Sequence, residues 1–429
     1  MDAWTAHTGA LLSFRGDPGE GDAPTWDYWE HGALIVAGGR IEAVGPGPEL
    51  LRAHAGITVV DHGAGLILPG FIDAHIHYPQ TDMIAAGGRD LLDWLTRYAF
   101  PTEQAFGAAA HAAEVAEFFL DELMRQGTTT AQVLGTVHAA SAEAFFQAAA
   151  RRRLRMIAGK SLMDRNAPAG LLDTAADCER ELRELIGRWH GHGRLGYAIT
   201  PRFAPTSTPE QLARAGALAR EFPDVFVHSH LAENVREIEW VRELFPGARS
   251  YLDVYDGAGL LRERATYAHC IHLDAADRIR MAASGAGAAF CPTSNLYLGS
   301  GLFDLAASDA AGMRFALATD VGGGTSFSML ATMAEAWKVA QLQGQRLAPL
   351  RAFYLATLAG ARQLGLADRI GSLAPGLEAD FIVLDPEATP LLARRMRRAA
   401  TLSERLMLWM MLGDDRAVAA TYILGERVK

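Results

Sequence analysis

The sequence has little cysteine, no long apolar run and no excess of positive charge, and each shortage excludes a class of protein. Its three cysteines, Cys178, Cys270 and Cys291, form no CxxC pair and cannot build a disulfide framework, which is typical of the reducing cytoplasm. The apolar stretch Leu406–Leu412 is too short to cross a bilayer, and the start Met1-Asp2-Ala3 lacks the basic and apolar segments of a secretory signal. We therefore expect a cytoplasmic protein with no membrane partner.

Net charge and chain length limit the classes of partner and the number of domains that we expect. Lysine and arginine total 40 against 50 aspartate and glutamate residues, so the net charge is −10. An acidic surface does not favour a phosphate backbone, and we expect no nucleic-acid partner. Because 50% of the 429 residues are hydrophobic, the chain has enough apolar side chains for a large core. Its length predicts one large domain with a smaller one.

Strand patterns occupy both ends of the chain. The hairpin signal Gly38-Gly39 separates two of them. The predicted terminal strands are 33–37, 40–44, 57–61, 379–384 and 417–424. We expect residues 1–68 and 371–429 to pair into one small β-sandwich.

Between these ends, over residues 69–370, eight short apolar runs mostly alternate with helical patterns. The runs are 71–75, 128–133, 154–158, 195–200, 225–230, 265–269, 288–291 and 315–319. Helix signals include a start at Thr208-Pro209-Glu210-Gln211 and a helix from about Thr102 to Gly127. An open doubly wound sheet has a similar alternation, but the count of eight favours an α/β fold of the TIM-like (β/α)₈ barrel type.

The first barrel strand ends in a histidine pair. His75 and His77 are two positions apart, so their side chains leave the strand on the same side. In a barrel both rings would lie at the carboxyl-terminal mouth, where barrel active sites are found. Two imidazoles placed in this way can chelate Zn²⁺ or Fe²⁺.

Three further strand ends carry residues of the same kind. Strand five ends at His230 with Glu233 three positions later, strand six ends at His269, and strand eight ends at Asp320. Because the carboxyl ends of barrel strands converge, these side chains would meet the histidine pair of strand one. The combination predicts a metal site and is far more specific than any one of its members.

This order of strand-end residues resembles the amidohydrolase superfamily of metal-dependent barrel enzymes, and within it the chain is similar to the guanine deaminase family. The segments that carry the resemblance run along nearly the whole chain. They are 75–83, 91–95, 100–103, 200–203, 230–234 and 319–324. The resemblance also implies a sandwich made from both termini and a homodimer.

The resemblance implies one zinc ion per subunit, and the ligand types accept Fe²⁺ as well. The implied ligands are His75, His77, His230 and Asp320. Such a metal lowers the pKa of a bound water from about 15.7 to about 7. No lysine lies in residues 195–203, where a second metal would need a bridging group, so we expect a mononuclear site.

The implied reaction is hydrolytic deamination of guanine to xanthine and ammonia, a step of purine catabolism. A metal-bound hydroxide would attack C2 of guanine. Glu233 would move a proton from the water to N3, His269 would orient the hydroxide, and Asp320 would take the remaining proton. Acid–base help of this kind contributes roughly 10²–10⁴ in rate.

Substrate recognition within that reaction requires polar groups that match a purine edge. Arg202 suits the O6 carbonyl, and Gln80 can donate or accept on a ring edge. Phe203 is expected to form a wall for the flat ring, and His269 to contact the substrate as well. We interpret Trp94 as a packing residue rather than a substrate contact.

Two other functions fit parts of the pattern. One is deamination or dechlorination of another heterocycle, such as a triazine, a pterin or an oxidised purine. The other is a non-enzymatic scaffold that has kept the barrel, although the full ligand set with Glu233 favours an enzyme.

Gly322–Gly324 could cradle a phosphate, but without a following Lys-Ser/Thr a loop over the site is favoured. The basic run Arg394–Arg398 is interpreted as a solvated helix face or an oligomer contact.

Overall fold

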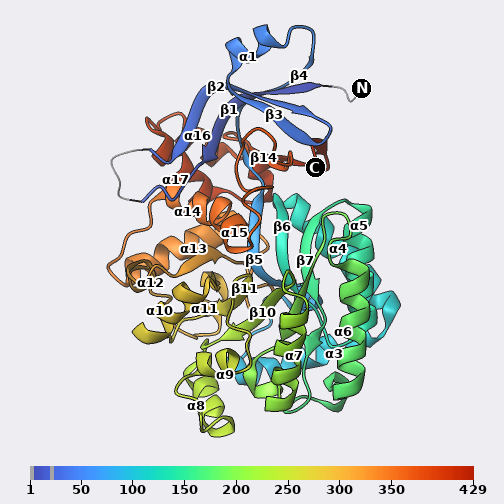
Figure 1. Cartoon of the computed structure of the whole chain (residues 1–429). Helices are drawn as coiled ribbons and strands as arrows, with labels where there is room; N and C mark the ends of the chain where they lie inside the picture. The colour runs from blue at the N-terminus through green and yellow to red at the C-terminus, as the bar shows by residue number, and fades with distance from the viewer. Residues whose placement is uncertain (1–3, 20–23) are drawn as a thin grey trace.

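Two sheets organise the computed structural model, which describes residues 4–19 and 24–429 (Figure 1). One is a seven-stranded sheet of mixed direction at one end of the molecule, and the other is the parallel barrel. The predicted fold class is confirmed. The limits of the predicted domains at 68/69 and 370/371 stay predictions.

The terminal sheet is built from both ends of the chain, as expected. Its strand order is β16-β15-β14-β4-β1-β2-β3, so that β14 from the C-terminal segment pairs with β4 from the N-terminal one. The strands are β1 (Thr5–Phe14), β2 (Trp26–Ala37), β3 (Arg40–Pro46), β4 (Thr58–Pro69), β14 (Phe381–Leu384), β15 (Val418–Ile423) and β16 (Glu426–Arg427). Helix α1 (Gly47–Ala53) follows β3. The two segments therefore share one continuous sheet.

The barrel contains the eight predicted strands, each within a few residues of its expected limits. They are β5 (Phe71–His77), β6 (Thr128–Leu134), β7 (Arg155–Gly159), β9 (Gly196–Pro201), β10 (Phe226–Leu231), β11 (Ala265–His269), β12 (Gly287–Phe290) and β13 (Arg314–Leu317), with a short β8 (Ser161–Leu162) against β9. Backbone hydrogen bonds from Asp320 N to His75 O (3.0 Å) and from His77 N to Val321 O (2.8 Å) join the last strand's loop to the first strand. The ends of strands one and eight thus lie together.

Helices cover the barrel. The longer ones are α4 (Ala109–Arg125), α5 (Ala139–Arg151), α6 (Ala175–Trp189), α7 (Pro209–Glu221), α8 (Val235–Leu244), α10 (Ala275–Ser284), α13 (Met329–Leu342) and α17 (Leu402–Leu412). Shorter ones are α9 (Tyr251–Gly257), α12 (Leu305–Ala310), α14 (Pro349–Leu355), α15 (Leu358–Gln363) and α16 (Pro390–Met396). Among the described helices none is both long and apolar enough to cross a membrane.

One predicted helix start is confirmed and one predicted helix is wrong. The side chain of Thr208 accepts a hydrogen bond from Gln211 N at the start of α7, as expected. The helix expected from Thr102 to Gly127 is divided, because Ala108 is extended (φ −84°, ψ 108°) and α4 begins after it. Buried Phe106 packs against Tyr78 just before this break, which redirects the chain into the core.

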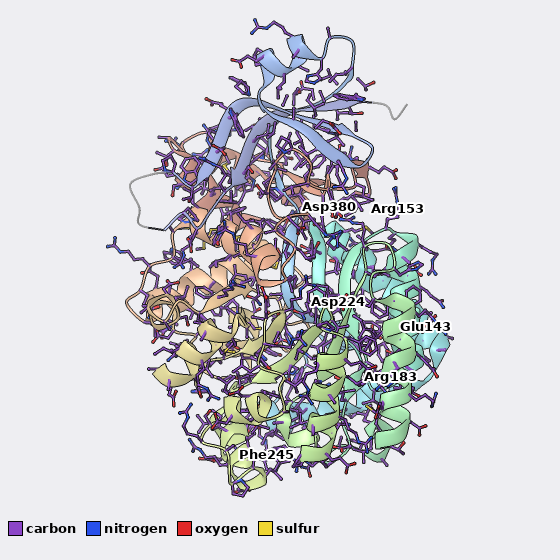
Figure 2. The ribbon with its side chains drawn as sticks, viewed as in Figure 1. Glu143, Arg153, Arg183, Asp224, Phe245 and Asp380 are labelled. Atoms are coloured by element: carbon purple, nitrogen blue, oxygen red, sulfur yellow. The ribbon has the colours of Figure 1, made fainter. Side chains whose placement is uncertain are left out.

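Two arginines, of which Arg155 is buried and Arg194 half-buried, join the barrel to the terminal sheet in the region where Figure 2 labels Asp380. Arg155 donates from Nε to Glu378 Oε2 (2.9 Å), and Arg194 donates to Glu378 (2.7 Å) and pairs with Asp380. Strand β5 leaves the terminal sheet directly after β4, so its carboxyl end points away from this junction. Helices α3 (Phe100–Gln104) and α8 lie at that far end of the molecule (Figure 1).

Candidate active site

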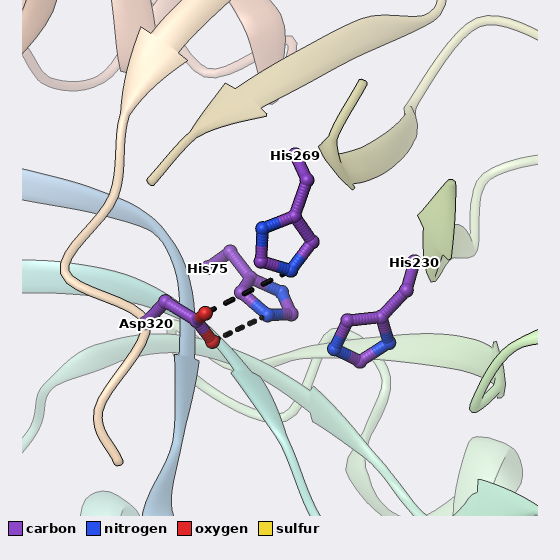
Figure 3. Close-up of side chains that lie close together, drawn as sticks. All are labelled: His75, His230, His269 and Asp320. Carbon is purple, nitrogen blue, oxygen red and sulfur yellow. Dashed lines mark ion pairs between the residues drawn. The ribbon is translucent and has the colours of Figure 1, made fainter. Parts of the chain in front are cut away.

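The four expected metal ligands converge at the carboxyl end of the barrel. His77 Nε2 lies 3.1 Å from His75 Nε2 and 3.1 Å from His230 Nε2. One oxygen of Asp320 lies 3.0 Å from His75 Nε2 and 3.4 Å from His77 Nε2. His75, His77 and Asp320 are buried, while His230 retains partial exposure; Figure 3 shows three of the four together with His269.

These separations fit a shared cation. Zinc–ligand distances of about 2.0–2.1 Å in a tetrahedron place neighbouring ligand atoms about 3.4 Å apart. His269 also offers a nitrogen within 4.8 Å of the ligand atoms of His75, His230 and Asp320. It lies farther out, however, with its Nε2 at 3.7 Å from Asp320 and 3.3 Å from Glu233. The tighter set is therefore the one that contains His77.

The histidines of this set are neutral and face inward. Burial lowers the pKa of His75, and burial with neighbouring histidines lowers those of His77 and His230 well below the usual value. His230 Nδ1 donates to the carbonyl of Arg202 (2.6 Å), which leaves Nε2 with its lone pair for a metal. His228 lies behind the set, with Nε2 2.6 Å from His75 Nδ1.

Asp320, a carboxylate, is the fourth member of the donor set, which consists of the four side chains that could bind a metal: His75, His77, His230 and Asp320. Burial alone would raise its pKa, but the neighbouring His75 and His269 outweigh burial and the pKa is lowered. The backbone is in the left-handed region at Asp320 (φ 52°) and at His269 (φ 72°). Strained non-glycine backbone of this kind clusters at functional sites, where it aims side chains. Three neutral imidazoles with one carboxylate suit Zn²⁺ or Fe²⁺.

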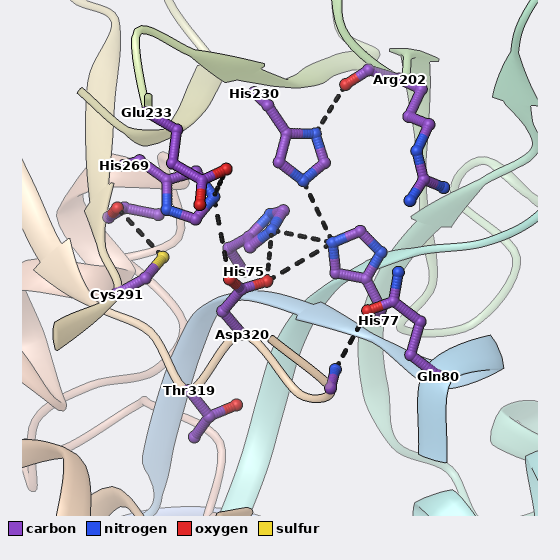
Figure 4. A network of polar contacts seen from close by, with 12 residues as sticks. His75, His77, Gln80, Arg202, His230, Glu233, His269, Cys291, Thr319 and Asp320 are labelled. Carbon is purple, nitrogen blue, oxygen red and sulfur yellow. Dashed lines mark hydrogen bonds and ion pairs between the residues drawn. The ribbon is translucent and has the colours of Figure 1, made fainter. Parts of the chain in front are cut away.

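Glu233 stands beside the donor set and is poised to exchange a proton. It is buried, and burial raises the pKa of its carboxyl group to about 7. Ser300 Oγ donates to Glu233 Oε1 (2.9 Å), and His269 Nε2 lies 3.3 Å from Glu233 Oε2; Figure 4 shows His269 beside Glu233. His269 Nδ1 lies 2.9 Å from Oδ1 of Asn295, a residue of helix α11 (Pro292–Tyr297). The segment after β12, the seventh barrel strand, thus contributes Asn295 on α11 and Ser300 beyond it, which the strand-end pattern did not reveal.

Arg202 and Gln80 meet on the opposite wall through a shared partner, Glu103. Arg202 Nη1 donates to both oxygens of Glu103 (2.7 and 2.5 Å), and Gln80 Nε2 donates to Oε1 (2.9 Å). Gln80 Oε1 accepts from Gly322 N (3.1 Å), so the ring-facing role expected of Gln80 is reduced to donation. Glu103 was not among the predicted site residues. It could have been noticed because it lies in residues 100–103, one of the segments that carry the family resemblance.

A partly open cavity lies between the two walls, with about 390 Å³ of empty space when the part open to solvent is included. Phe203 and Trp94 both line it. Trp94 is buried beside Leu91 and Leu95 and donates from Nε1 to Ala86 O (2.9 Å), which agrees with its interpretation as a packing residue. The lining consists of His77, Gln80, Leu91, Trp94, Leu95, Arg202, Phe203, His230, Glu233, Glu237, His269, Leu298, Asp320 and Gly323.

Two neighbouring features bear on the expected chemistry. Lys160 is fully buried, and its Nζ bonds Asp173 (2.8 Å) and Glu181 (2.6 Å), so it is engaged elsewhere than at the donor set. The glycines after Asp320 permit close packing, since a Cβ on Gly324 would lie 1.8 Å from Thr319 O. Both observations agree with a mononuclear site under a closely packed loop.

Comparisons with known proteins show which family the chain belongs to. The Amidohydrolase family pattern matches residues 66–428. The guanine deaminase of Escherichia coli strain K12 is 49% identical over 408 residues, which cover 94% of this chain and 92% of that protein. The solved E. coli guanine deaminase superposes with a TM-score of 0.95 at 47% identity over 99% of both chains. A guanine deaminase from C. acetobutylicum, solved with guanine in its active site, superposes with a TM-score of 0.91 at 26% identity, covering 99% of this chain and 100% of that one. The chain therefore belongs to the amidohydrolase family.

Proposed function

We propose that this protein catalyses the hydrolytic deamination of guanine to xanthine and ammonia. The observation that carries the proposal is the composition of one cavity and of the side chains next to it. A three-histidine and aspartate donor set and a buried glutamate form one side, and a donor wall for a carbonyl group forms the other. The similarity to guanine deaminases over nearly the whole chain supports the same conclusion.

The metal would be held by His75, His77, His230 and Asp320, one ion per chain. When bound, the metal would lower the pKa of a water molecule toward neutrality and thereby supply a nucleophile at neutral pH. The neutral imidazoles and the ionised carboxylate are in the protonation states that binding requires.

Glu233 would carry the proton between water and substrate. A carboxyl group with a pKa near 7 both accepts and releases a proton at neutral pH. It would take one proton from the attacking water and deliver it to N3 of guanine, which neutralises the charge that develops in the ring. His269 Nε2 lies 3.3 Å from Glu233 and 3.7 Å from Asp320, so His269 would orient the attacking oxygen and Asp320 would accept its remaining proton. Asp320 would then pass this proton to the exocyclic amine, so that ammonia leaves C2 and xanthine remains.

The opposite wall would orient the ring. Arg202 and Gln80 present N–H groups, which match the O6 acceptor of guanine and leave C2 directed toward the donor set. Phe203 and Trp94 would bury the ring faces. A homodimeric state and a cytoplasmic location, expected from the sequence, are part of the same proposal.

Ammonia release across a panel of guanine, adenine, cytosine and melamine tests the proposal. We expect guanine to be preferred by at least about 10²-fold in kcat/KM, because a wall built to donate hydrogen bonds rejects rings with an amino group in that place. Preference for another ring would contradict the substrate and leave the hydrolytic chemistry standing. No ammonia from any ring in metal-loaded protein would favour a non-enzymatic scaffold.

A further inference from the structure

Glu103 is a buried carboxylate that serves the cavity without lining it. It lies on α3, and its side chain is fully buried. Its hydrogen-bond partners are the two recognition side chains, Arg202 and Gln80. Phe100, one helical turn earlier on the same face, lies 5.5 Å from the Arg202 guanidinium carbon. Helix α3 therefore contacts the Arg202 guanidinium twice, through the hydrogen bonds to Glu103 and through the ring of Phe100.

This arrangement fixes the orientation of the Gln80 amide. Gly322 N donates to its oxygen, and Glu103 accepts from its nitrogen. The reversed amide would place an N–H against an N–H and an oxygen against a carboxylate, so neither contact could form. Gln80 therefore keeps one N–H free for the cavity, while its oxygen is held by Gly322 N.

Arg202 is held in a similar way. Nη1 is occupied by Glu103, while Nε and Nη2 make no hydrogen bond to any residue in the described part of the chain. Because Glu103 neutralises the guanidinium charge, the wall attracts a neutral acceptor rather than a free anion. Both recognition residues thus present donors only.

We propose that Glu103 is a positioning residue that makes this wall selective for a ring carbonyl. The inference rests on the proposed function, because it identifies what sets that site's substrate class. Removal of the carboxylate would free the Gln80 amide to turn and leave Arg202 without its partner, so the preference for a carbonyl would fall.

Glu103→Gln and Glu103→Asp test the role, with guanine as substrate and two ligands that lack the C2 amine as competitive inhibitors. Hypoxanthine carries a carbonyl at position 6, and purine carries hydrogen there. For Glu103→Gln we expect the KM for guanine and the inhibition constant of hypoxanthine to rise roughly 10- to 100-fold, as for loss of hydrogen bonds to a charged group. The inhibition constant of purine should change less than about 3-fold, and kcat less than KM. Glu103→Asp keeps the charge and should restore part of the preference for hypoxanthine.

Glu378→Gln is the matched control, since it removes a buried carboxylate paired with Arg155 and Arg194 at the opposite end of the barrel. It should leave the hypoxanthine-to-purine ratio unchanged. Equal weakening of both ligands in folded Glu103→Gln, or no weakening of hypoxanthine, would overturn the inference. If Glu103→Gln does not fold, Glu103→Asp decides, and an unchanged ratio in that variant overturns it. Wild-type protein that fails to deaminate guanine, yet loses its hypoxanthine preference on substitution, would contradict the proposed function alone.

Discussion

At the scale of single residues, Glu233 is the group on which the proposed proton transfer depends. Its pKa near 7 comes first from burial, and Ser300 and His269 hold it beside the donor set. Glu233→Gln keeps the shape but cannot exchange the proton. We expect kcat to fall roughly 10²–10⁴-fold while metal content is retained, as measured by guanine loss and elemental analysis.

The matched control for this substitution is Glu239→Gln, on the exposed face of α8 six residues later. It should leave kcat near the wild-type value. Near-normal turnover in Glu233→Gln would show that another group moves the proton.

The donor set was predictable residue by residue, whereas its supports were not. The two-residue alternation of β5 places His75 and His77 on one side, and strand order places His230 and Asp320 beside them. Glu103 meets Arg202 across 99 positions, and nothing in either segment shows that the two will pair. The amide orientation of Gln80 likewise depends on Gly322, 242 residues away.

At the scale of elements, Asp73 ties strand one to the loop after strand eight. Its carboxylate accepts from Thr319 N (3.1 Å), from Thr319 Oγ1 and from His75 N (3.2 Å), so it fixes the backbone on both sides of the donor set. Asp73→Ala leaves three buried donors without an acceptor. We expect zinc affinity to fall about 10–100-fold, measured by competition with a chromophoric chelator, because supports of ligands have effects of that size.

Asp277→Ala provides the comparison, since Asp277 is a buried carboxylate bonded to Ser250 and Arg249 away from the donor set. Both variants should lose stability in urea, but only Asp73→Ala should lose zinc affinity. Equal affinity in the two would mean that Asp73 only stabilises the barrel.

Strands were predicted better than helices, and for a physical reason. Each barrel strand is a short apolar run buried on both faces, which is a local signal. The division of the expected helix 102–127 depends on where Phe106 packs, which is a tertiary contact that helical periodicity does not contain. The segment thereby gains a separate α3, which is what places Glu103 at the cavity.

At the scale of the whole molecule, His7 makes the terminal sheet sensitive to pH. It lies on β1 with its ring 4.8 Å from the rings of Phe381 and Tyr422, and its Nδ1 is 3.2 Å from His62 Nε2. Burial, followed by the charge of His62, lowers the pKa of His7 from 6.5 to about 4. The unfolded chain therefore binds a proton more readily than the folded one, and stability falls as the pH drops from 6.5 toward 4.

His7→Leu removes this contribution. Between pH 7 and pH 5 we expect the unfolding free energy of the wild type to fall by about 2 kcal/mol more than that of His7→Leu, from urea unfolding at each pH. His31→Leu, at an exposed position of β2, should behave as the wild type. If the unfolding free energies of His7→Leu and the wild type decline in parallel, other groups cause the loss of stability at acidic pH.

We propose that one metal ion, held by His75, His77, His230 and Asp320 at the carboxyl end of the barrel, supports deamination of guanine. The most direct measurement is a titration of metal-stripped protein with Zn²⁺, and separately with Fe²⁺, following guanine turnover and bound metal together. We expect no turnover without metal and a linear recovery that ends at about one equivalent per chain. Turnover in the stripped protein, or recovery that continues to two equivalents, would contradict it.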